Sequence, residues 1–362
     1  SQSLTNQPPA PPSISSEQHD TTYDITFTWN IIDFALAFNR ARQEANRTVM
    51  LRLDYIRLQQ NLILEVTKSY WKAQLALKGI SRAKDLINRI NEYQQKIRYY
   101  VDKGTLPAMP NLKMDAQLSK FKLQLQDFNR DYTTAKSQLA QFMGLRSADM
   151  FEMIPMEMGA IESFKFNWNE LEGIAVTHRP ELFGKDVEEK VFIDEVHNQA
   201  LQLIPGLGPY GQTKFDSNKF LIWNHWLQAG LKITYNIFGI PNAYYGMKAA
   251  EQQQELVKKN RVALTLGVLT QIQLALLLNQ DAYDNYLIAK DYNNTQQKLK
   301  DQAFQVLKVG EFHDGDVLSY ESDAFLAEMT AYERYGNFML SLEQINNSIG
   351  LPRYFQNKEE DL

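Results

Sequence analysis

The sequence predicts a mostly helical protein with a small β-sheet portion, in which a long helical hairpin occurs twice. Three observations predict this class. Two very long stretches have no proline and almost no glycine. Apolar residues in the segments after these stretches repeat every 3.5 residues, and two short segments alternate polar and apolar residues. The first two patterns are typical of long packed helices, and the third is typical of strands with one apolar face.

The first long stretch covers residues 33–103, where 71 residues include one glycine and no proline. A helix of that length would extend roughly 105 Å, several times the width of a compact domain. The stretch ends at Gly104, and a shorter helix is predicted over residues 111–144. Its apolar positions step by four and three without a break: Met114, Leu118, Phe121, Leu125, Phe128, Tyr132, Ala135, Leu139 and Phe142. We therefore predict a hairpin whose shorter arm packs along a coiled-coil seam, with these side chains serving packing.

The second half of the chain repeats this layout. Residues 242–309 contain no proline and follow Pro241, which the first turn of a helix accepts. The stretch ends at Gly310, and a shorter helix is predicted over residues 316–350. Three pairs of segments differ by 206 positions: Gly104 and Gly310, Gly144 and Gly350, and residues 27–31 and 233–237. Three agreeing registers predict an internal duplication.

A strand is predicted at the start of each repeat. Apolar or aromatic residues occupy the odd positions of residues 23–31 and 227–237. Nine to eleven residues is the length of a tilted membrane-barrel strand, although a half-buried sheet on a soluble core alternates in the same way. Four aromatic residues near the strand ends favour a membrane interface: Trp29, Trp223, Trp226 and Tyr235. A weaker strand is predicted over residues 206–215, with a loop at 216–224.

The composition argues against several classes of function. A net charge of −5 gives no positive field for nucleic acid, and the lack of cysteine excludes thiolate sites and disulfides. His313, Asp314 and Asp316 lie close in sequence, but no ligand pair has helical spacing, so no metal or other cofactor is predicted. No phosphate loop or Ser-His-Asp pattern indicates an enzyme. Residues 262–280 are uncharged but include six polar residues, which favours a buried helix face over a lipid-spanning helix.

Several short segments occur in a specific order and spacing over about residues 21–352. They are Arg179-Pro180-Glu181-Leu182, Pro205-Gly206, Tyr235-Asn236-Ile237-Phe238-Gly239, Asp316-Val317-Leu318 after Gly310, and Ile349-Gly350-Leu351. In this order they resemble the TolC-type outer-membrane efflux proteins, the outer membrane factors of tripartite efflux and type I secretion systems.

The resemblance implies a homotrimeric channel in the outer membrane of a Gram-negative cell. Each protomer would give strands to a 12-stranded transmembrane β-barrel and long helices to a trimeric α-helical barrel that extends into the periplasm. The channel would be an exit duct for drugs or other exported substrates, opened when a periplasmic adaptor (membrane fusion) protein and an inner-membrane transporter dock. Unpaired strand edges are not tolerated in lipid, so one protomer could not insert its strands alone.

The resemblance also implies roles for residues at the periplasmic tip. A family carboxylate that forms a ring at the narrow entrance corresponds to Asp316, and Asp314 would partly replace a second carboxylate whose position holds Ser319. The alternative for Asp316 is an acid favoured by a helix N-terminus. Adaptor contacts are expected at Gly104, Thr105, Leu106, Gly310, Glu311 and Phe312, unless these residues are simple helix–helix turns. The family's gate positions hold Leu307, Phe312 and Pro110, so the resemblance does not predict how the tip is closed.

The repeats predict one elongated domain over residues 1–352. Repeat one covers about 21–145 after an extracellular-loop-like segment, 1–20; an equatorial linker covers 146–177, repeat two covers about 178–351, and 353–362 form a C-terminal tail. The 206-residue offset places the counterparts of the helix and strand at 178–215 mostly before residue 1, so we expect one strand and its helix to be missing there. Three strands per protomer would give nine in a trimer, whereas four give an antiparallel twelve.

Two alternative functions stay open. The first is a soluble or peripheral scaffold of long coiled-coil hairpins, with the strands as a small docking sheet. The second is a duct for type I secretion or metal efflux, which only the pump partner would distinguish from a drug-efflux duct. The sequence identifies neither the exported substrate nor the pump and adaptor.

Overall fold

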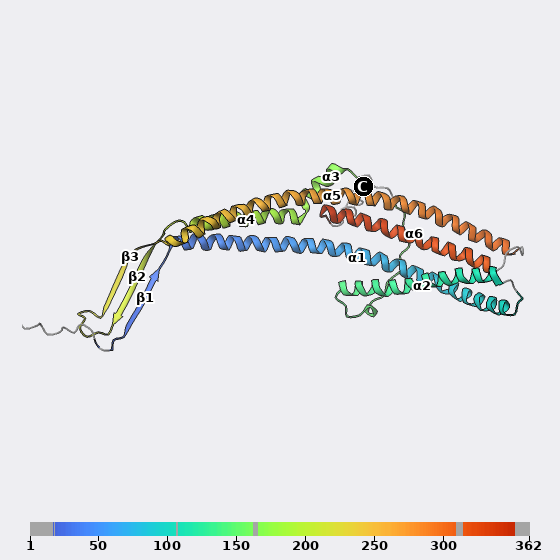
Figure 1. Ribbon diagram of the computed structural model, residues 1–362, viewed down its shortest axis with the longest axis horizontal. Helices are drawn as coiled ribbons and strands as arrows, with labels where there is room; N and C mark the ends of the chain where they lie inside the picture. Colours follow the sequence, from blue (N-terminus) through green and yellow to red (C-terminus); the bar gives the residue numbers. More distant parts are fainter. Residues whose placement is uncertain (1–16, 18, 106–107, 162–165, 309–313, 352–362) are drawn as a thin grey trace, which may run out of the picture. The chain divides into compact units, whose positions relative to one another are not determined.

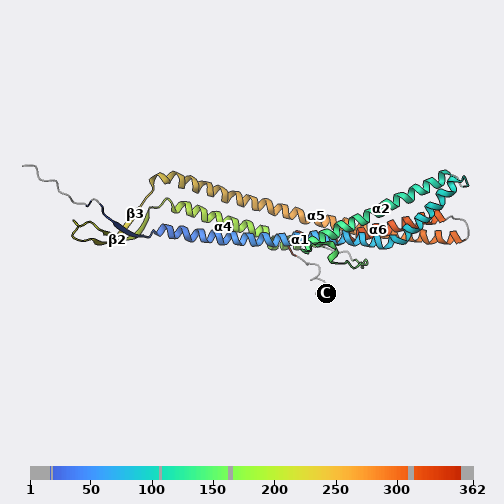
Figure 2. The ribbon, with the colours of Figure 1, turned by 90° about the horizontal axis from the view of Figure 1, so that it is seen from below.

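The computed structural model describes residues 17, 19–105, 108–161, 166–308 and 314–351 (Figure 1). Helices dominate this part of the chain, and the strands form one small sheet (Figures 1 and 2). In chain order the elements are β1 (Thr22–Thr28), α1 (Ile31–Asp102), α2 (Ala108–Phe142), a 3₁₀ turn (Ala148–Met150), α3 (Trp168–His178), α4 (Pro180–Leu201), β2 (Gly206–Asp216), β3 (His225–Thr234), a 3₁₀ turn (Ile237–Gly239), α5 (Ile240–Lys308) and α6 (Asp314–Ile349).

The element bounds follow the 206-residue offset. Subtracting 206 from the bounds of α5 gives 34–102, close to those of α1, and subtracting it from α6 gives 108–143, close to those of α2. Both shorter helices end at a glycine with positive φ, which is +70° at Gly144 and +77° at Gly350. In both places the next residue donates its backbone N–H five positions back, as in a Schellman cap: Leu145 to Ala140 at 2.9 Å and Leu351 to Asn346 at 3.2 Å.

We expect these two equivalent glycines to differ in their tolerance to substitution. A Cβ at Gly350 would lie 2.8 Å from the backbone oxygen of His178, whereas a Cβ at Gly144 would meet nothing within 4 Å. Both alanine variants carry the strain of a left-handed backbone, about 1–2 kcal/mol. We expect Gly350→Ala to lower the free energy of unfolding by clearly more than Gly144→Ala, as measured by urea denaturation. Equal losses of unfolding free energy in the two variants would mean that the turn before α4 shifts away from the added Cβ at little cost.

The chain divides into two compact units. The first comprises Ser1–Leu51 and Lys185–Asn260, and the second comprises Arg52–Gly184 and Arg261–Leu362. The long helices α1 and α5 contribute to both units, as does α4. The first unit contains the sheet, and the second contains α2, α3 and α6.

The sheet of the first unit has the order β1-β2-β3 with antiparallel neighbours. The weakly predicted strand is therefore confirmed as the central one. The ends of the other two predictions were wrong: β1 stops at Thr28 and β3 at Thr234, and after two further residues α1 begins at Ile31 and a 3₁₀ turn at Ile237. In each case an asparagine side chain accepts a backbone hydrogen bond that starts the next element, Asn30 from Ile32 and Asn236 from Gly239, both at 3.1 Å.

The strand register gives the sheet one apolar face and one polar face. Ile25 lies opposite Thr213, which lies opposite Leu227, and the same face carries Tyr23, Phe27, Phe215, Leu207, Leu231 and Ile233. The other face carries Asp24, Gln212, Lys214, Gln228 and Lys232. On this polar face Gln212 donates to Asp24 at 2.5 Å, and the Lys214 ammonium lies 5.5 Å from the Trp226 ring centre. The large apolar side chains of β1 and β3 are exposed; Leu231, for example, is 76% exposed.

Buried polar contacts join α1 to α4 in the first unit. Arg42 binds Asp194 through two guanidinium nitrogens, and Asp194 is almost fully buried. Gln43 donates to the backbone oxygen of Val191 at 3.0 Å and accepts from Asn198 at 3.2 Å. These contacts fix which residues of the two helices face each other, because a buried amide without a partner costs about 1–3 kcal/mol.

Helix α6 lies at the core of the second unit. Eighteen of its residues are buried, many of them small. Near one end it packs with α1 and α2 around Ile90, Leu118, Phe121, Leu125 and Phe325; near the other it packs with α3, α4 and α5 around Leu171, Leu182, Ile272, Ile345 and Ile349. The predicted seam of α2 is thus confirmed, since its central members are core residues.

The predicted linker contains an extended segment, residues 151–161, that buried polar side chains hold against α1 and α6. Gln74 donates to the Ile154 oxygen at 2.9 Å, Lys78 binds Glu157 at 2.7 Å, and the Tyr332 hydroxyl donates to the Met156 oxygen at 2.5 Å. Burial raises the pKa of Tyr332 to about 12. The segment is therefore fixed by its backbone as well as by its side chains.

Residues 262–280 form part of helix α5, and among the described residues α5 is the helix that is long and apolar enough to cross a membrane by composition. One such helix is weak support for a span. The prediction of a buried face was only partly right within the single chain. Val268, Ile272, Ala275 and Asn279 form a buried stripe, but Leu277 is 70% exposed and Leu266 is exposed as well.

Candidate functional site

The two predicted gate carboxylates lie in the first turn of α6, next to α1 and the end of α5. Asp314 is exposed and Asp316 is half-buried. Between them Gly315 is buried against Tyr93 of α1, and a Cβ at this glycine would overlap the Tyr93 hydroxyl. A cavity of about 220 Å³ lies here, lined by Arg89, Glu92, Tyr93 and Lys96 of α1, Phe304 and Leu307 of α5, and Asp314, Val317 and Leu318 of α6.

The carboxylates act on the hydroxyl of Tyr93, a half-buried residue. Burial raises the pKa of Tyr93, and the charges of Asp316 and Asp314 raise it further. Both acids also occupy the turn where a helix dipole favours a negative charge, so their place in the helix is explained without a channel as well. Among the residues described, no group of three His, Asp or Glu side chains is arranged to hold a metal ion. His313 lies outside the described residues.

The structure describes two of the other predicted tip residues, Gly104 and Thr105. Gly104 has φ +70° and, with Thr105, caps α1: their N–H groups donate to Val101 at 2.9 Å and Tyr100 at 3.0 Å. This is a helix C-cap, as the turn alternative predicts. Leu106, Gly310, Glu311 and Phe312 lie outside the described residues, so their role as adaptor contacts stays a prediction.

Two ion pairs between α1 and α6 were not predicted. Arg89 binds Glu321 at 2.7 Å, and Arg82 binds Glu328 at 3.3 Å. The arginines are seven residues apart on α1 and the glutamates are seven apart on α6, which is the spacing of charges beside an antiparallel coiled-coil seam. The equal seven-residue spacing of the arginines and of the glutamates was the sequence signal from which these ion pairs could have been predicted.

The predicted interface aromatics lie around the sheet. Trp29 follows β1, Tyr235 follows β3, and Trp223 and Trp226 lie at the start of β3. Trp223 is 78% exposed, and the Tyr235 hydroxyl donates to the Leu203 oxygen at 3.3 Å. Trp29, Trp223 and Tyr235 thus lie at both ends of the strands, whereas Trp226 lies on the polar face beside Lys214. The interfacial belt stays a prediction.

Solved structures with the same arrangement of strands and long helices are outer-membrane channels. The chain aligns with the CmeC channel of Campylobacter jejuni at a TM-score of 0.77 over 94% of this chain and 74% of that one, with 14% identity. It aligns with the OprN channel at 0.73 over 93% and 82%, with 15% identity. For the open state of the MtrE channel of Neisseria gonorrhoeae the TM-score is 0.71 over 94% and 78%, with 14% identity. The chain has the fold of these outer-membrane channels.

At the level of the fold, the resemblance predicted from the sequence is thus confirmed. No protein-family model and no curated protein sequence matches the chain, so the likeness to the outer-membrane channels is one of structure.

Within this outer-membrane-channel fold, Arg179 and Glu181 form a buried charge cluster at the end of α6. The Arg179 side chain is 2% exposed; it donates to the Asn347 oxygen at 2.9 Å and to Gln271 at 2.7 Å, and it pairs with Glu181 at 3.0 Å. Arg57 of α1 also pairs with Glu181, at 3.3 Å, and donates to the same Asn347 oxygen at 3.0 Å. Two guanidinium groups therefore share one carboxylate and cap the negative end of α6. Burial lowers the pKa of Arg179 to about 10.

Proposed function

We propose that the protein is an exit duct in the outer membrane of a Gram-negative cell, extending into the periplasm and serving export from an inner-membrane pump and its periplasmic adaptor. The observation that carries this proposal is the sheet of the first unit. One of its faces is apolar and exposed, and the other is polar. In water the apolar face would have to be covered, whereas in a barrel it would face lipid and the polar face would line an aqueous lumen.

Oligomerisation follows from the edges of this sheet. Strands β1 and β3 are edge strands, and within the described chain no further strand pairs with them. Such edges have no partners in lipid, so closure requires strands from other protomers. We propose a homotrimer in which the strands of three protomers close one transmembrane β-barrel. Exposed apolar residues along α5, such as Leu266 and Leu277, support helix packing between protomers.

The decisive experiment is the oligomeric mass in detergent, combined with single-channel conductance in planar bilayers. We expect the mass of three chains and stable single-channel currents. A stable monomer that purifies without detergent would support the alternative, a soluble scaffold, and would contradict the duct.

Asp316 gives the proposed duct a residue-level test. Three symmetry-related carboxylates around a constriction would concentrate cations and bind multivalent ones. We expect Asp316→Asn to weaken block of the channel by a multivalent cation such as hexamminecobalt several-fold, measured as the blocking concentration in planar bilayers.

Asp127→Asn provides the control, because this exposed acid forms an i,i+3 ion pair with Arg130 on α2. Unchanged block in Asp316→Asn would remove this residue from the constriction. Equal weakening in both variants would point to the general surface charge.

A further inference from the structure

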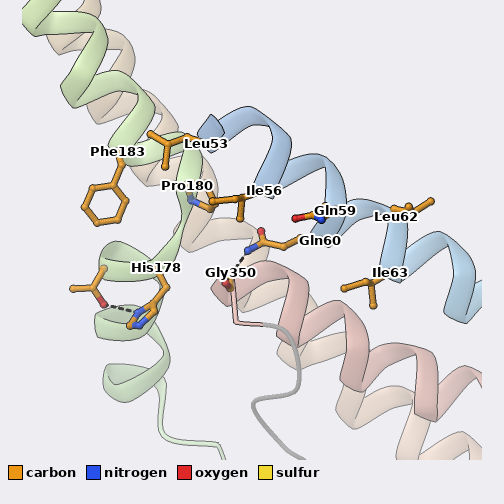
Figure 3. Close-up of a pocket in the computed structure, with 11 residues that line it drawn as sticks. Leu53, Ile56, Gln59, Gln60, Leu62, Ile63, His178, Pro180, Phe183 and Gly350 are labelled. Atoms are coloured by element: carbon orange, nitrogen blue, oxygen red, sulfur yellow. Dashed lines mark hydrogen bonds between the residues drawn. The ribbon is translucent and has the colours of Figure 1, made fainter. Parts of the chain in front are cut away.

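An apolar groove of about 630 Å³ lies in the second unit beside the C-terminal cap of α6 (Figure 3). One wall is a face of α1, and the other is the turn between α3 and α4 with Gly350 at the end of α6. The residues that line it are Leu53, Ile56, Gln59, Gln60, Leu62, Ile63, Thr177, His178, Pro180, Phe183 and Gly350. Most of these side chains are apolar, and Phe183, Leu62 and Ile63 are each about two-fifths exposed.

The polar groups in the groove are largely engaged within the chain. Gln60 donates to the Gly350 oxygen at 2.8 Å, the bond drawn in Figure 3. The Nδ1 atom of His178 lies 3.0 Å from the Ile174 oxygen and 2.9 Å from the Thr177 hydroxyl. An occupant would therefore gain most from apolar contact, and exposed apolar area of this kind favours a binding partner.

The chain leaves α6 at this groove. Gly350 lines it, and Leu351 is followed by Pro352-Arg353-Tyr354-Phe355 and then by a polar and acidic run, Gln356 to Asp361. Four or five extended residues span about 13–18 Å. The groove follows α1 from Leu53 to Ile63, which is about 15 Å of helix. Tyr354 and Phe355 are thus the aromatic pair whose position in the sequence matches the groove's length and chemistry.

We infer that the groove between α1 and the α3–α4 turn holds the protein's own C-terminal tail, with Tyr354 and Phe355 packed against Ile56, Ile63 and Phe183. The tail would cover the groove beside the cap of α6, where Arg57 and Arg179 both bind the backbone oxygen of Asn347. This docking goes beyond the proposed duct and does not depend on it.

Disulfide trapping tests the inference, because the natural chain has no cysteine. A disulfide needs Cβ atoms about 3.5–4.5 Å apart. We expect Ile56→Cys with Phe355→Cys to form an intramolecular disulfide under mild oxidation. Leu123→Cys with Phe355→Cys is the control, since Leu123 is an exposed residue of α2 outside the groove.

Three results of this trapping would overturn the inference. They are no disulfide between positions 56 and 355, equal yields at positions 56 and 123, or a disulfide that joins two chains. The last result would assign the groove to a second copy of the protein.

A second measurement leaves the tail at its natural length. In the single variant Ile56→Cys, we expect a thiol reagent to react about tenfold more slowly than in the same protein carrying Tyr354→Ser and Phe355→Ser, because burial of one aromatic side chain favours the covered state by at least that ratio. Gln356→Ser with Asn357→Ser should leave the slow rate unchanged. Equal rates in all three proteins would show that the tail does not occupy the groove.

Discussion

Replacing Leu231 by arginine is expected to prevent insertion of the strands into a lipid bilayer. Leu231 lies in the middle of β3 on the apolar face, opposite Pro209. An arginine near the bilayer midplane costs about 2–4 kcal/mol, and three copies in a trimer would cost roughly 6–12 kcal/mol. That range reaches the whole stability of an ordinary domain, about 5–15 kcal/mol.

Gln228→Arg provides a matched control three residues earlier on the same strand. Gln228 lies opposite Gln212 on the polar face, which already carries Lys214 and Lys232. We expect this variant to insert like the natural protein. The measurement is the fraction of protein that floats with lipid vesicles in a density gradient after refolding from urea. Equal flotation of both variants would mean that the apolar face does not meet lipid, and loss of flotation in both would mean that the polar face does not meet water.

The presence of the strands could be predicted, because a strand alternates polar and apolar residues both when its apolar face meets lipid and when that face packs on a protein core. The ends of the strands could not be predicted. Asn30 and Asn236 continue the polar positions of the alternation, and only the structure shows that each accepts a backbone hydrogen bond from the next turn. An asparagine can serve both roles, so the pattern alone extends the strand too far. The two residues differ by 206 positions, so one cause explains both errors.

Both shorter helices were predicted to within three residues at each end, although their apolar patterns differ. The seam of α2 has a large residue at every step except Ala135. In α6 small residues take the place of some large apolar ones, because this helix packs among α1, α2, α3 and α5. Small residues such as Ala327 and Ala331 let the helix backbones approach. Gly336 shows the same effect: a Cβ there would lie 3.4 Å from Trp71.

The buried charge cluster could be predicted only in part. Arg179 and Glu181 belong to a segment that the sequence singled out, but Arg57 and Asn347 are more than 100 residues away on either side. Nothing in local spacing connects four residues on α1, on α6 and at the α3–α4 turn. Their association depends on tertiary packing. The role of each charge in this cluster can be tested by substitution.

Removing the shared carboxylate by Glu181→Gln is expected to lower the free energy of unfolding by about 3–5 kcal/mol, the usual cost of breaking a buried ion pair. The change would leave Arg57 and Arg179 close together without a counter-charge. Glu328→Gln is the matched control. Both glutamate side chains are about one-fifth exposed, but the partner of Glu328, Arg82, is 60% exposed, against 2% for Arg179. An exposed partner limits the loss to about 1 kcal/mol.

The pH dependence distinguishes charge repulsion from a simple loss of packing. The folded-state pKa of Arg179 is about 10, below its ordinary value of 12.5, because burial disfavours the charged form. Above pH 10 the folded protein therefore binds fewer protons than the unfolded chain, and this group favours folding increasingly as pH rises. In Glu181→Gln the missing counter-charge should lower that pKa further. Urea unfolding at pH 7 and pH 10.5 should then show the stability gap between Glu181→Gln and the natural protein narrowing at the higher pH. A gap of equal size at both values would mean that Glu181 acts by packing and not by balancing the two guanidinium charges.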